Sequence, residues 1–219
     1  KDTYTQVQEI RSYYNFNDVD VDRYTVDGQY RMVLVSPREL DSASLPAEAN
    51  TWINLHLKYT HGYGVVMSPS SEVTAEGLPA YYFSDVPPKT STDIALNRPE
   101  LYFGELTNSY VVVNTKEPEF DYPRATSEDI VPTFYKGNGG VPVGNILSRL
   151  AFMLRFRDYQ ILVSGAMSSE SRLLYRRNIK DRVQTIAPFF MYDADPYIVV
   201  ADGKLYWMMD AYTVSANYP

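Results

Sequence analysis

Alternation of apolar and polar residues predicts two β-hairpins, one near each end of the chain. Residues 18–22 alternate strictly and lead into residues 23–35, where Asp27-Gly28 interrupts a run that is typical of strands. Residues 197–209 show the same arrangement around Asp202-Gly203. A two-residue type I′ turn needs positive φ at both central positions, and Asp-Gly meets this need. Both glycines are therefore expected to have positive φ.

Apolar residues at helical spacing predict helices in three further regions. Residues 3–14 begin with a possible capping box, Thr3 and Gln6. Residues 145–157 are apolar on most of the helix circumference, so we expect the most buried helix here, and a charge at Leu150 should prevent folding. Residues 168–186 read as an amphipathic helix that ends before a proline. Another helix start is expected at residues 36–39, with Ser as cap, Pro first and Glu third.

The segment 46–60 fits two patterns. Alternate residues from Ile53 to Tyr59 are mostly apolar, as in a strand, whereas Trp52, His56 and Tyr59 recur as in a helix. We favour a helix that Gly62 closes in a left-handed conformation. Strands are expected at 64–67, 80–83, 101–103 and 110–114, and a loop at 136–140. This interleaving, without a regular βαβ rhythm, predicts an α+β fold with a mainly antiparallel sheet and a single domain over residues 1–219.

Composition narrows the class of protein. The chain has 219 residues, is 45% hydrophobic and 21% charged, and so has the balance of a globular fold. It has no apolar run near the roughly 20 residues that span a bilayer, and its ends suggest an excised domain. A net charge of -7 argues against nucleic-acid binding, and the lack of cysteine excludes disulfides and thiolate sites.

The stretch 51–88 contains both histidines of the chain, and its motifs resemble those of one family. The segments that carry the resemblance are Trp52-Ile53-Asn54, His56-Leu57, Tyr59 to Val66, Glu76-Gly77-Leu78-Pro79, residues 99–105, residues 144–157 and Trp207 to Thr213. They are similar, in the same order, to UPF0182, an uncharacterised family of bacterial membrane proteins. The resemblance implies several membrane-spanning helices followed by a large extracytoplasmic region, of which this chain would be a soluble part. No activity is assigned to that family, so the resemblance implies no catalytic residues.

The motifs considered for cofactor binding and for a catalytic nucleophile are incomplete or absent. Residues 139–144 match the first half of a phosphate loop, but Asn145 and Ile146 stand where Lys and Ser or Thr are required. No G-x-S-x-G nucleophile elbow occurs. The sequence therefore predicts no cofactor.

One acidic run is a candidate metal site. Asp18, Asp20 and Asp22 offer the oxygen ligands that Ca²⁺ prefers, but Arg23 stands where an EF-hand loop requires Gly. The alternative is a charged strand face.

The two histidines allow two interpretations. We predict that Trp52, His56, Tyr59, His61 and Tyr63 form one cluster where the helix ends. If the cluster is a structural joint, both imidazoles bond to backbone and are closed to solvent. If it is a ligand site formed by the two histidines and two tyrosines, a ring nitrogen faces a pocket and titrates near pH 6.5. The two histidines are five residues apart, which is poor spacing for chelation by a helix.

A basic segment is the other candidate binding surface. It consists of Arg172, Arg176, Arg177, Lys180 and Arg182, all within the predicted helix 168–186. This face either is solvated or contacts anionic lipid headgroups or a cell-wall polymer.

Three functions are compatible with these observations. The preferred one is a non-catalytic extracytoplasmic module that binds an envelope ligand or a partner. The second is an envelope-acting hydrolase that uses His56 or His61 with a carboxylate such as Asp85 or Glu76. The third is a structural piece that packs on the remainder of its own chain, which a large exposed apolar patch would favour.

Overall fold

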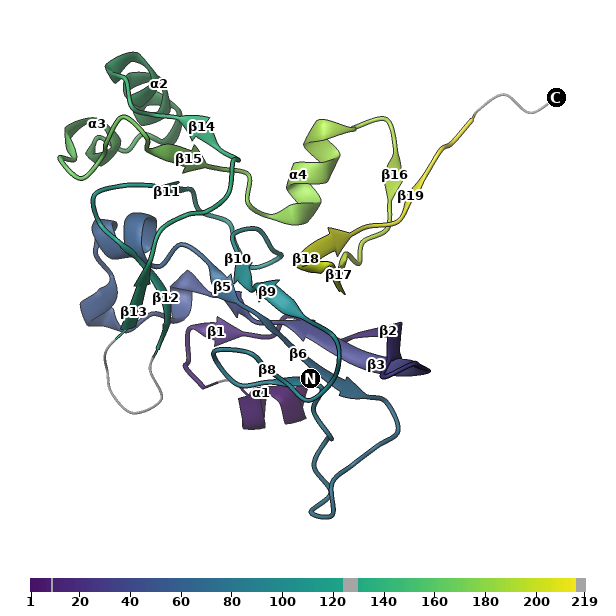
Figure 1. Cartoon of the computed structure of the whole chain (residues 1–219). Coiled ribbons are helices and arrows are strands. Elements are labelled where there is room, and N and C mark those ends of the chain that lie inside the picture. The colour runs from purple at the N-terminus through teal and green to yellow at the C-terminus, as the bar shows by residue number, and fades with distance from the viewer. Residues whose placement is uncertain (9, 124–129, 216–219) are drawn as a thin grey trace. The chain divides into compact units, whose positions relative to one another are not determined.

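The fold divides into two compact units, each assembled from segments that are distant in sequence (Figure 1). It is seen in a computed structural model that describes residues 1–8, 10–123 and 130–215. Unit 1 consists of Lys1–Asp41, His61–Thr107 and Asn178–Pro219, and unit 2 consists of Ser42–Thr60 and Asn108–Arg177. Both units combine helices with mostly antiparallel strands, so the α+β class is confirmed. The single-domain organisation stays a prediction.

Unit 1 is built around a five-stranded sheet with the order β2-β3-β6-β7-β8. A second sheet has the order β17-β18-β9, in which β9 runs parallel to β18. The elements of unit 1 are α1 (Asp2–Gln8), β1 (Tyr14–Asn15), β2 (Asp20–Val26), β3 (Gln29–Pro37), β4 (Glu39–Leu40), β5 (Gly62–Tyr63), β6 (Val65–Pro69), β7 (Phe83–Ser84), β8 (Lys89–Thr90), β9 (Leu96–Arg98), β10 (Glu100–Leu101), α4 (Ile179–Ile186), β16 (Met191–Tyr192), β17 (Tyr197–Ala201), β18 (Gly203–Met208) and β19 (Ala211–Tyr212).

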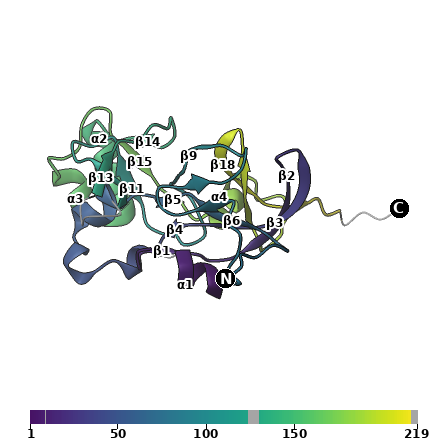
Figure 2. The ribbon, with the colours of Figure 1, turned by 60° about the horizontal axis from the view of Figure 1, so that its bottom comes forward.

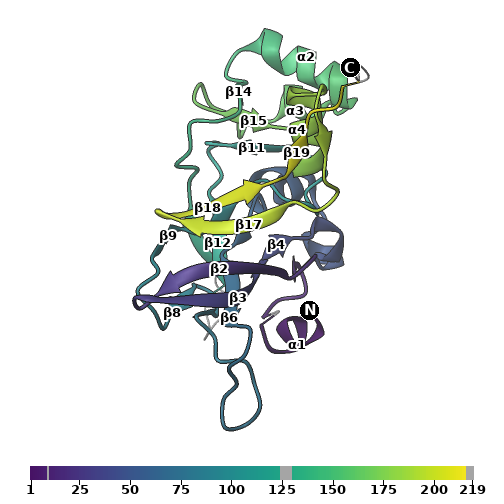
Figure 3. The same cartoon turned by 90° about the vertical axis from the view of Figure 1, so that its right-hand side faces the viewer.

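Both predicted hairpins are confirmed. Asp27 and Gly28 have φ of 49° and 75°, and Asp202 and Gly203 have φ of 51° and 70°, as two-residue turns of this type require. The β17–β18 hairpin runs alongside the β2–β3 hairpin (Figure 3), where the Val200 amide donates to the Tyr24 hydroxyl at 2.8 Å.

Both faces of the main sheet are covered. On one face, Val65 and Met67 pack with Ile198 of the second hairpin. On the other face, Val66 packs with Tyr4 and Phe16. A strand buried on both faces has a continuous apolar sequence, which explains the run from Val65 to Met67.

At two places in unit 1 the sequence predicts a helix, but the residues pair as strands. The helix predicted over residues 3–14 ends at Gln8, and Tyr14 pairs with Leu40 in the β1–β4 ladder. The helix start predicted at residues 36–39 is wrong, because β3 continues through Pro37, which pairs with Val65. Glu39 lies in β4 and is 1% exposed. Ladder hydrogen bonds and burial at these positions outweigh a capping pattern that is worth about 1 kcal/mol.

The predicted left-handed conformation of Gly62 is also wrong. Gly62 lies in β5 and pairs with Leu101, and the positive φ of 73° belongs to Gly64. Position 62 instead requires glycine because the backbone at Arg38 lies very close to it. A β-carbon at position 62 would lie 2.3 Å from the Arg38 carbonyl oxygen. The glycine therefore makes room for a neighbouring chain and does not end a helix.

Unit 2 packs helices on a small antiparallel sheet with the order β11-β15-β14 (Figure 2). Its core consists of Leu57, Tyr110, Val112, Val143, Ile161, Met167 and Leu173. Its elements are two 3-10 helices (Ser42–Ser44 and Ala47–Ala49), a π-helix (Asn54–Lys58), β11 (Val111–Val113), β12 (Glu119–Pro123), β13 (Ile130–Thr133), β14 (Val141–Pro142), α2 (Ile146–Phe156), α3 (Gln160–Val163) and β15 (Arg172–Leu174).

The helical interpretation of residues 46–60 is confirmed in part, because Asn54–Lys58 forms a π-helix that the Tyr59 amide closes on the Asn54 carbonyl at 2.8 Å. The strands predicted at 64–67, 80–83, 101–103 and 110–114 all have a counterpart, although their bounds shift by one to three residues. The loop at 136–140 is confirmed as well.

The helix predicted over 168–186 is wrong for its first half. Leu173 lies in the centre of the β15 strand, where it faces both Val112 and Val141, and it is fully buried. The helix begins only after Asn178, whose side chain accepts hydrogen bonds from the Lys180 and Asp181 amides. A residue in the central strand of a three-stranded sheet belongs to a strand that forms backbone hydrogen bonds with neighbours on both sides. A helix at the same place would lose these interstrand hydrogen bonds.

The helix α2 has the predicted bounds but not the predicted burial. Asn145 caps it by accepting from the Ser148 amide at 2.8 Å, and Arg157 ends it with φ of 55°. None of its residues is buried, and Leu150 is 41% exposed. The expectation that α2 is the most buried helix is therefore wrong, because only one side of it faces the core of unit 2.

Candidate functional site

The five aromatic residues predicted to form one cluster are divided between the two units. Trp52, His56 and Tyr59 belong to unit 2, whereas His61 and Tyr63 belong to unit 1. The division falls between Thr60 and His61, so each imidazole has its own surroundings.

His56 is held by Tyr110 in unit 2. Its Nδ1 lies 2.7 Å from the Tyr110 carbonyl oxygen, and its ring stacks on the Tyr110 ring at 4.1 Å and 13°. Burial lowers the pKa of His56, and the backbone hydrogen bond and Asp158 only partly oppose this. The imidazole is therefore neutral at pH 7, with Nδ1–H donating to the carbonyl. This backbone contact is the one expected of a structural joint.

A polar network beside His56 escaped the sequence reasoning. The Tyr110 hydroxyl donates to Asp158 Oδ2 at 2.5 Å, and Trp52 Nε1 donates to the same oxygen at 2.9 Å. Burial raises the pKa of Asp158, but the hydrogen bonds from Tyr110, Gln160 and Trp52 outweigh it and lower the pKa overall. The only sequence signal was that a half-buried indole N–H requires an acceptor, and this signal does not say which residue supplies it.

His61 is enclosed in unit 1. It is 1% exposed, its Nδ1 lies 3.1 Å from the Gly62 carbonyl oxygen, and its ring lies 4.8 Å from that of Tyr102. Tyr63 beside it is also buried. His61 therefore serves the packing of unit 1, as the structural interpretation expects.

Neither Tyr59, the remaining aromatic candidate, nor the hollows among the described residues form a ligand site with a histidine. Tyr59 packs edge-on against Phe120 at 4.7 Å in unit 2. Unit 1 has hollows of about 360 and 220 Å³, and among the described residues no histidine lines either of them. Asp85, one of the carboxylates considered for a hydrolase, forms an ion pair with Lys89 at 2.9 Å.

The basic residues do not share one helix face. In unit 2, Arg172 donates to the Gly139 and Gly140 carbonyls, and Arg177, which is 2% exposed, donates to the Thr60 carbonyl at 2.5 Å. In unit 1, Lys180 pairs with Glu105 at 2.8 Å, and Arg182 lies over the Phe103 ring. Arg176 is exposed and has φ of 48°. These contacts stabilise the two units internally, and binding of an anionic polymer here stays a prediction.

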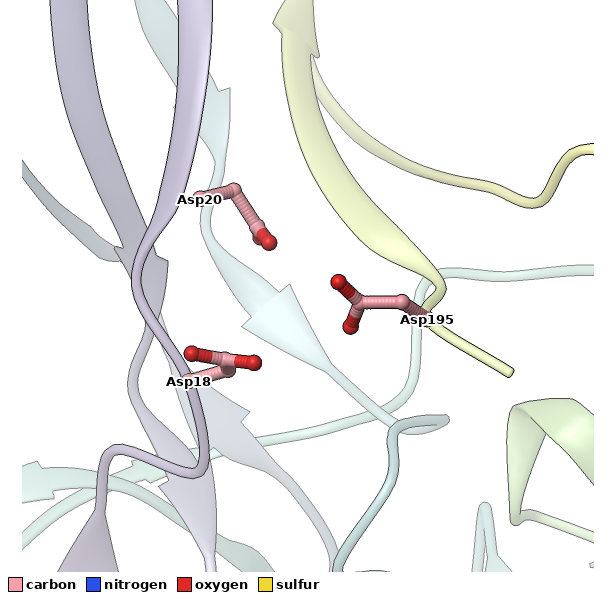
Figure 4. A group of neighbouring side chains, drawn as sticks. All are labelled: Asp18, Asp20 and Asp195. Atoms are coloured by element: carbon pink, nitrogen blue, oxygen red, sulfur yellow. The ribbon is translucent and has the colours of Figure 1, made fainter. Parts of the chain in front are cut away.

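Three carboxylates meet beside β2 in unit 1 (Figure 4). Oxygens of Asp18, Asp20 and Asp195 lie within 4.8 Å of one another, whereas Asp22 is not in the group. Burial, with the charges of Asp195 and Asp18, raises the pKa of Asp20 to about 6. Counted at one oxygen each, the three carboxylates supply three of the six to eight oxygens of a Ca²⁺ site, so the metal site stays a prediction.

The most exposed apolar surface among the described helices is on α2. Ile146, Leu147, Leu150 and Leu154 are 63%, 74%, 41% and 66% exposed, and we call these four side chains the outer face of α2. The opposite side of the helix packs through Phe152 and Phe156 against the unit 2 core. The outer face therefore presents apolar side chains to solvent, although a helix apolar on all sides is normally enclosed.

Comparisons with known proteins place the whole chain in one family. The model of the uncharacterised protein family UPF0182 matches residues 1–219. A UPF0182 protein of Pelotomaculum thermopropionicum is 54% identical over 217 residues, which are 99% of this chain and 24% of that protein. UPF0182 proteins of Trichodesmium erythraeum and Cupriavidus necator are 49% and 51% identical, over 23% and 24% of their lengths and 99% and 100% of this chain.

No solved structure matches the chain significantly. Among the described residues, no helix is both long enough and apolar enough to cross a bilayer. The chain spans about a quarter of the length of the curated relatives that it matches. With a family model covering every residue and relatives near half identity, the chain belongs to the UPF0182 family.

Proposed function

We propose that this chain is a non-catalytic, extracytoplasmic module of a bacterial integral membrane protein, and that it binds the remainder of its own polypeptide through the outer face of α2. The observation that carries the proposal is the exposure of Ile146, Leu147, Leu150 and Leu154 on a helix whose other side is already packed. The chain matches only about a quarter of its relatives' length, so the same polypeptide offers ample further surface.

The free energy available at this face is large for so short a helix. Transferring a fully exposed Leu or Ile side chain out of water contributes about 2 kcal/mol. With the exposed fractions observed here, covering the outer face contributes roughly 5 kcal/mol. That contribution is comparable to the net stability of a small domain, so docking of this face would stabilise the longer protein substantially.

The histidine geometry supports a non-catalytic role. Each imidazole Nδ1 lies within hydrogen-bond reach of a backbone carbonyl, and His61 is enclosed. A general base must reach a substrate proton, and these arrangements hold the rings in packing positions instead. A hydrolase built on His56 or His61 is therefore the weaker alternative.

The proposed location is supported by the family resemblance, which implies a large extracytoplasmic region after membrane-spanning helices. Alkaline phosphatase fused directly after residue 219 of the membrane-bound protein should be active, because this enzyme matures only outside the cytoplasm. Activity of a cytoplasmic reporter at the same junction, with an inactive phosphatase, would contradict the location.

Docking of the outer face is tested by cysteine labelling in the full-length protein. The chain has no cysteine of its own, so Leu147→Cys and the matched Asn138→Cys in the exposed loop introduce single thiols into this module. With any other cysteines replaced, and rates normalised to those in urea, a polar maleimide should label position 147 at least about tenfold more slowly than position 138, a ratio equivalent to about 1.4 kcal/mol of occlusion. Equal normalised rates would show that the face is open and would overturn the proposal.

A further inference from the structure

We infer that the occupant of the outer face of α2 is a single α-helix from the part of the polypeptide outside residues 1–219, packed lengthwise along α2. This inference rests on the proposed function, because it names what covers the same face. It is carried by the shape of the face, by the orientation of the nearby arginines and by the packing of α2 on the core of unit 2.

The outer face has the geometry of a helix-packing seam. Leu147, Leu150 and Leu154 are spaced by three and four residues, the spacing of the core positions of a coiled coil. At 3.6 residues per turn, the four side chains cover about 100° of the circumference and run along the whole helix. Such a narrow, straight stripe accommodates the ridge of another helix crossing at about 20°.

A β-strand is a poorer occupant of this face. A strand is stabilised by ladder hydrogen bonds with an open backbone edge, whereas the amides and carbonyls in the middle of an α-helix are already bonded to each other. The outer face therefore offers side-chain packing alone, which is how one helix binds another.

A lipid surface is disfavoured by the arginines of α2. Interfacial helices extend their cations toward the headgroups. Here Arg149 Nε donates to the Val143 carbonyl at 2.9 Å, and the Arg155 guanidinium lies 5.1 Å from the centre of the Tyr175 ring. Both guanidinium groups thus turn back onto unit 2, away from the apolar stripe.

The helix α2 is preorganised to receive a partner. Phe156 stacks on Tyr110 at 4.6 Å, and Phe152 packs edge-on against Tyr175 at 5.7 Å. The Asn145 cap fixes the first turn. A face held in place from behind loses little conformational freedom on binding, so packing free energy is retained as affinity.

Photo-cross-linking in the full-length, membrane-embedded protein tests the inference. A photoreactive phenylalanine replaces Leu147 in one variant and Leu154 in another, and Asn138 in the exposed loop serves as control. The two positions are seven residues apart, or about 10.5 Å along α2. If the occupant is a helix, their adducts should map to one segment outside residues 1–219, with targets about seven residues apart; an extended strand would give a separation of about three residues.

The outcomes separate the two proposals. Targets in one segment of the same polypeptide at helical separation support both proposals. Targets in the same polypeptide at strand separation, or in two unrelated segments, overturn the helix but leave the proposed function standing. Adducts that form only with lipid or with another protein overturn both proposals. Adducts at positions 147 and 154 whose yield is no greater than at position 138 also overturn both.

Discussion

Neutralising Asp20 should stabilise the protein at neutral pH and leave its stability unchanged in acid. The folded protein raises the pKa of Asp20 from 3.8 to about 6, mainly through burial and then through Asp195 and Asp18. A carboxyl group whose pKa is raised by folding binds its proton more tightly in the folded state. Stability therefore falls as the pH rises from about 4 to about 6, and the full loss persists above that range.

The magnitude follows from the size of the shift. Two pKa units correspond to about 2.7 kcal/mol, but Asp20 is only half-buried and solvent screens its neighbours. After this discount, Asp20→Asn should raise the free energy of unfolding by about 1 to 1.5 kcal/mol at pH 7 and by nearly nothing at pH 3.5.

Urea unfolding of the wild type and Asp20→Asn at half-unit steps from pH 3.5 to 8 measures this difference directly. Asp22→Asn, on the same strand but outside the carboxylate cluster, is the matched control. A difference that does not change with pH, or that is equal in the control, would refute the electrostatic reasoning. Calcium at millimolar concentration distinguishes a metal site: stabilisation of the wild type but not of Asp20→Asn would support it, and equal midpoints would count against it.

Three further predictions address packing. Gly62→Ala should destabilise unit 1 by several kcal/mol, because its β-carbon would lie 2.3 Å from the Arg38 carbonyl oxygen. Gly28→Ala has open space around its β-carbon but a φ of 75°, so it should cost only about 1–2 kcal/mol. Thermal melting of the two variants compares these losses. Phe156→Ala should cost about 2–3 kcal/mol and Leu154→Ala less than about 0.5 kcal/mol in the 219-residue chain, and equal losses in urea unfolding would contradict the two-sided description of α2. Leu150→Asp should leave the far-ultraviolet circular dichroism of the 219-residue chain unchanged, because the new charge stays partly solvated, and a collapse of that signal would show that this side is buried.

Some contacts of the candidate sites could be predicted from the sequence, and others could not. The structural interpretation expected both imidazoles to bond to backbone and to be closed to solvent. Both have a backbone carbonyl within hydrogen-bond reach, but His61 is buried whereas His56 is only partly buried. Asp195 could not be foreseen as a neighbour of Asp18 and Asp20, because the two segments are about 175 residues apart and meet only when the β17–β18 hairpin packs beside β2. The partners Tyr110 and Asp158 of Trp52 are likewise 58 and 106 residues from it in sequence.

The sequence by itself determined the features that depend on a few adjacent residues. The two Asp-Gly turns and the bounds of α2 follow from local sterics and hydrogen bonds, and so does the α+β class that these elements make up. Only the tertiary structure decided that residues 36–39 extend a sheet, that Leu173 lies between two strands and that Gly62 makes room for Arg38. It alone also showed that α2 turns one apolar side outward. An apolar pattern specifies which side chains should leave water, but it does not specify which surface covers them, and in this structure Leu147, Leu150 and Leu154 are left exposed.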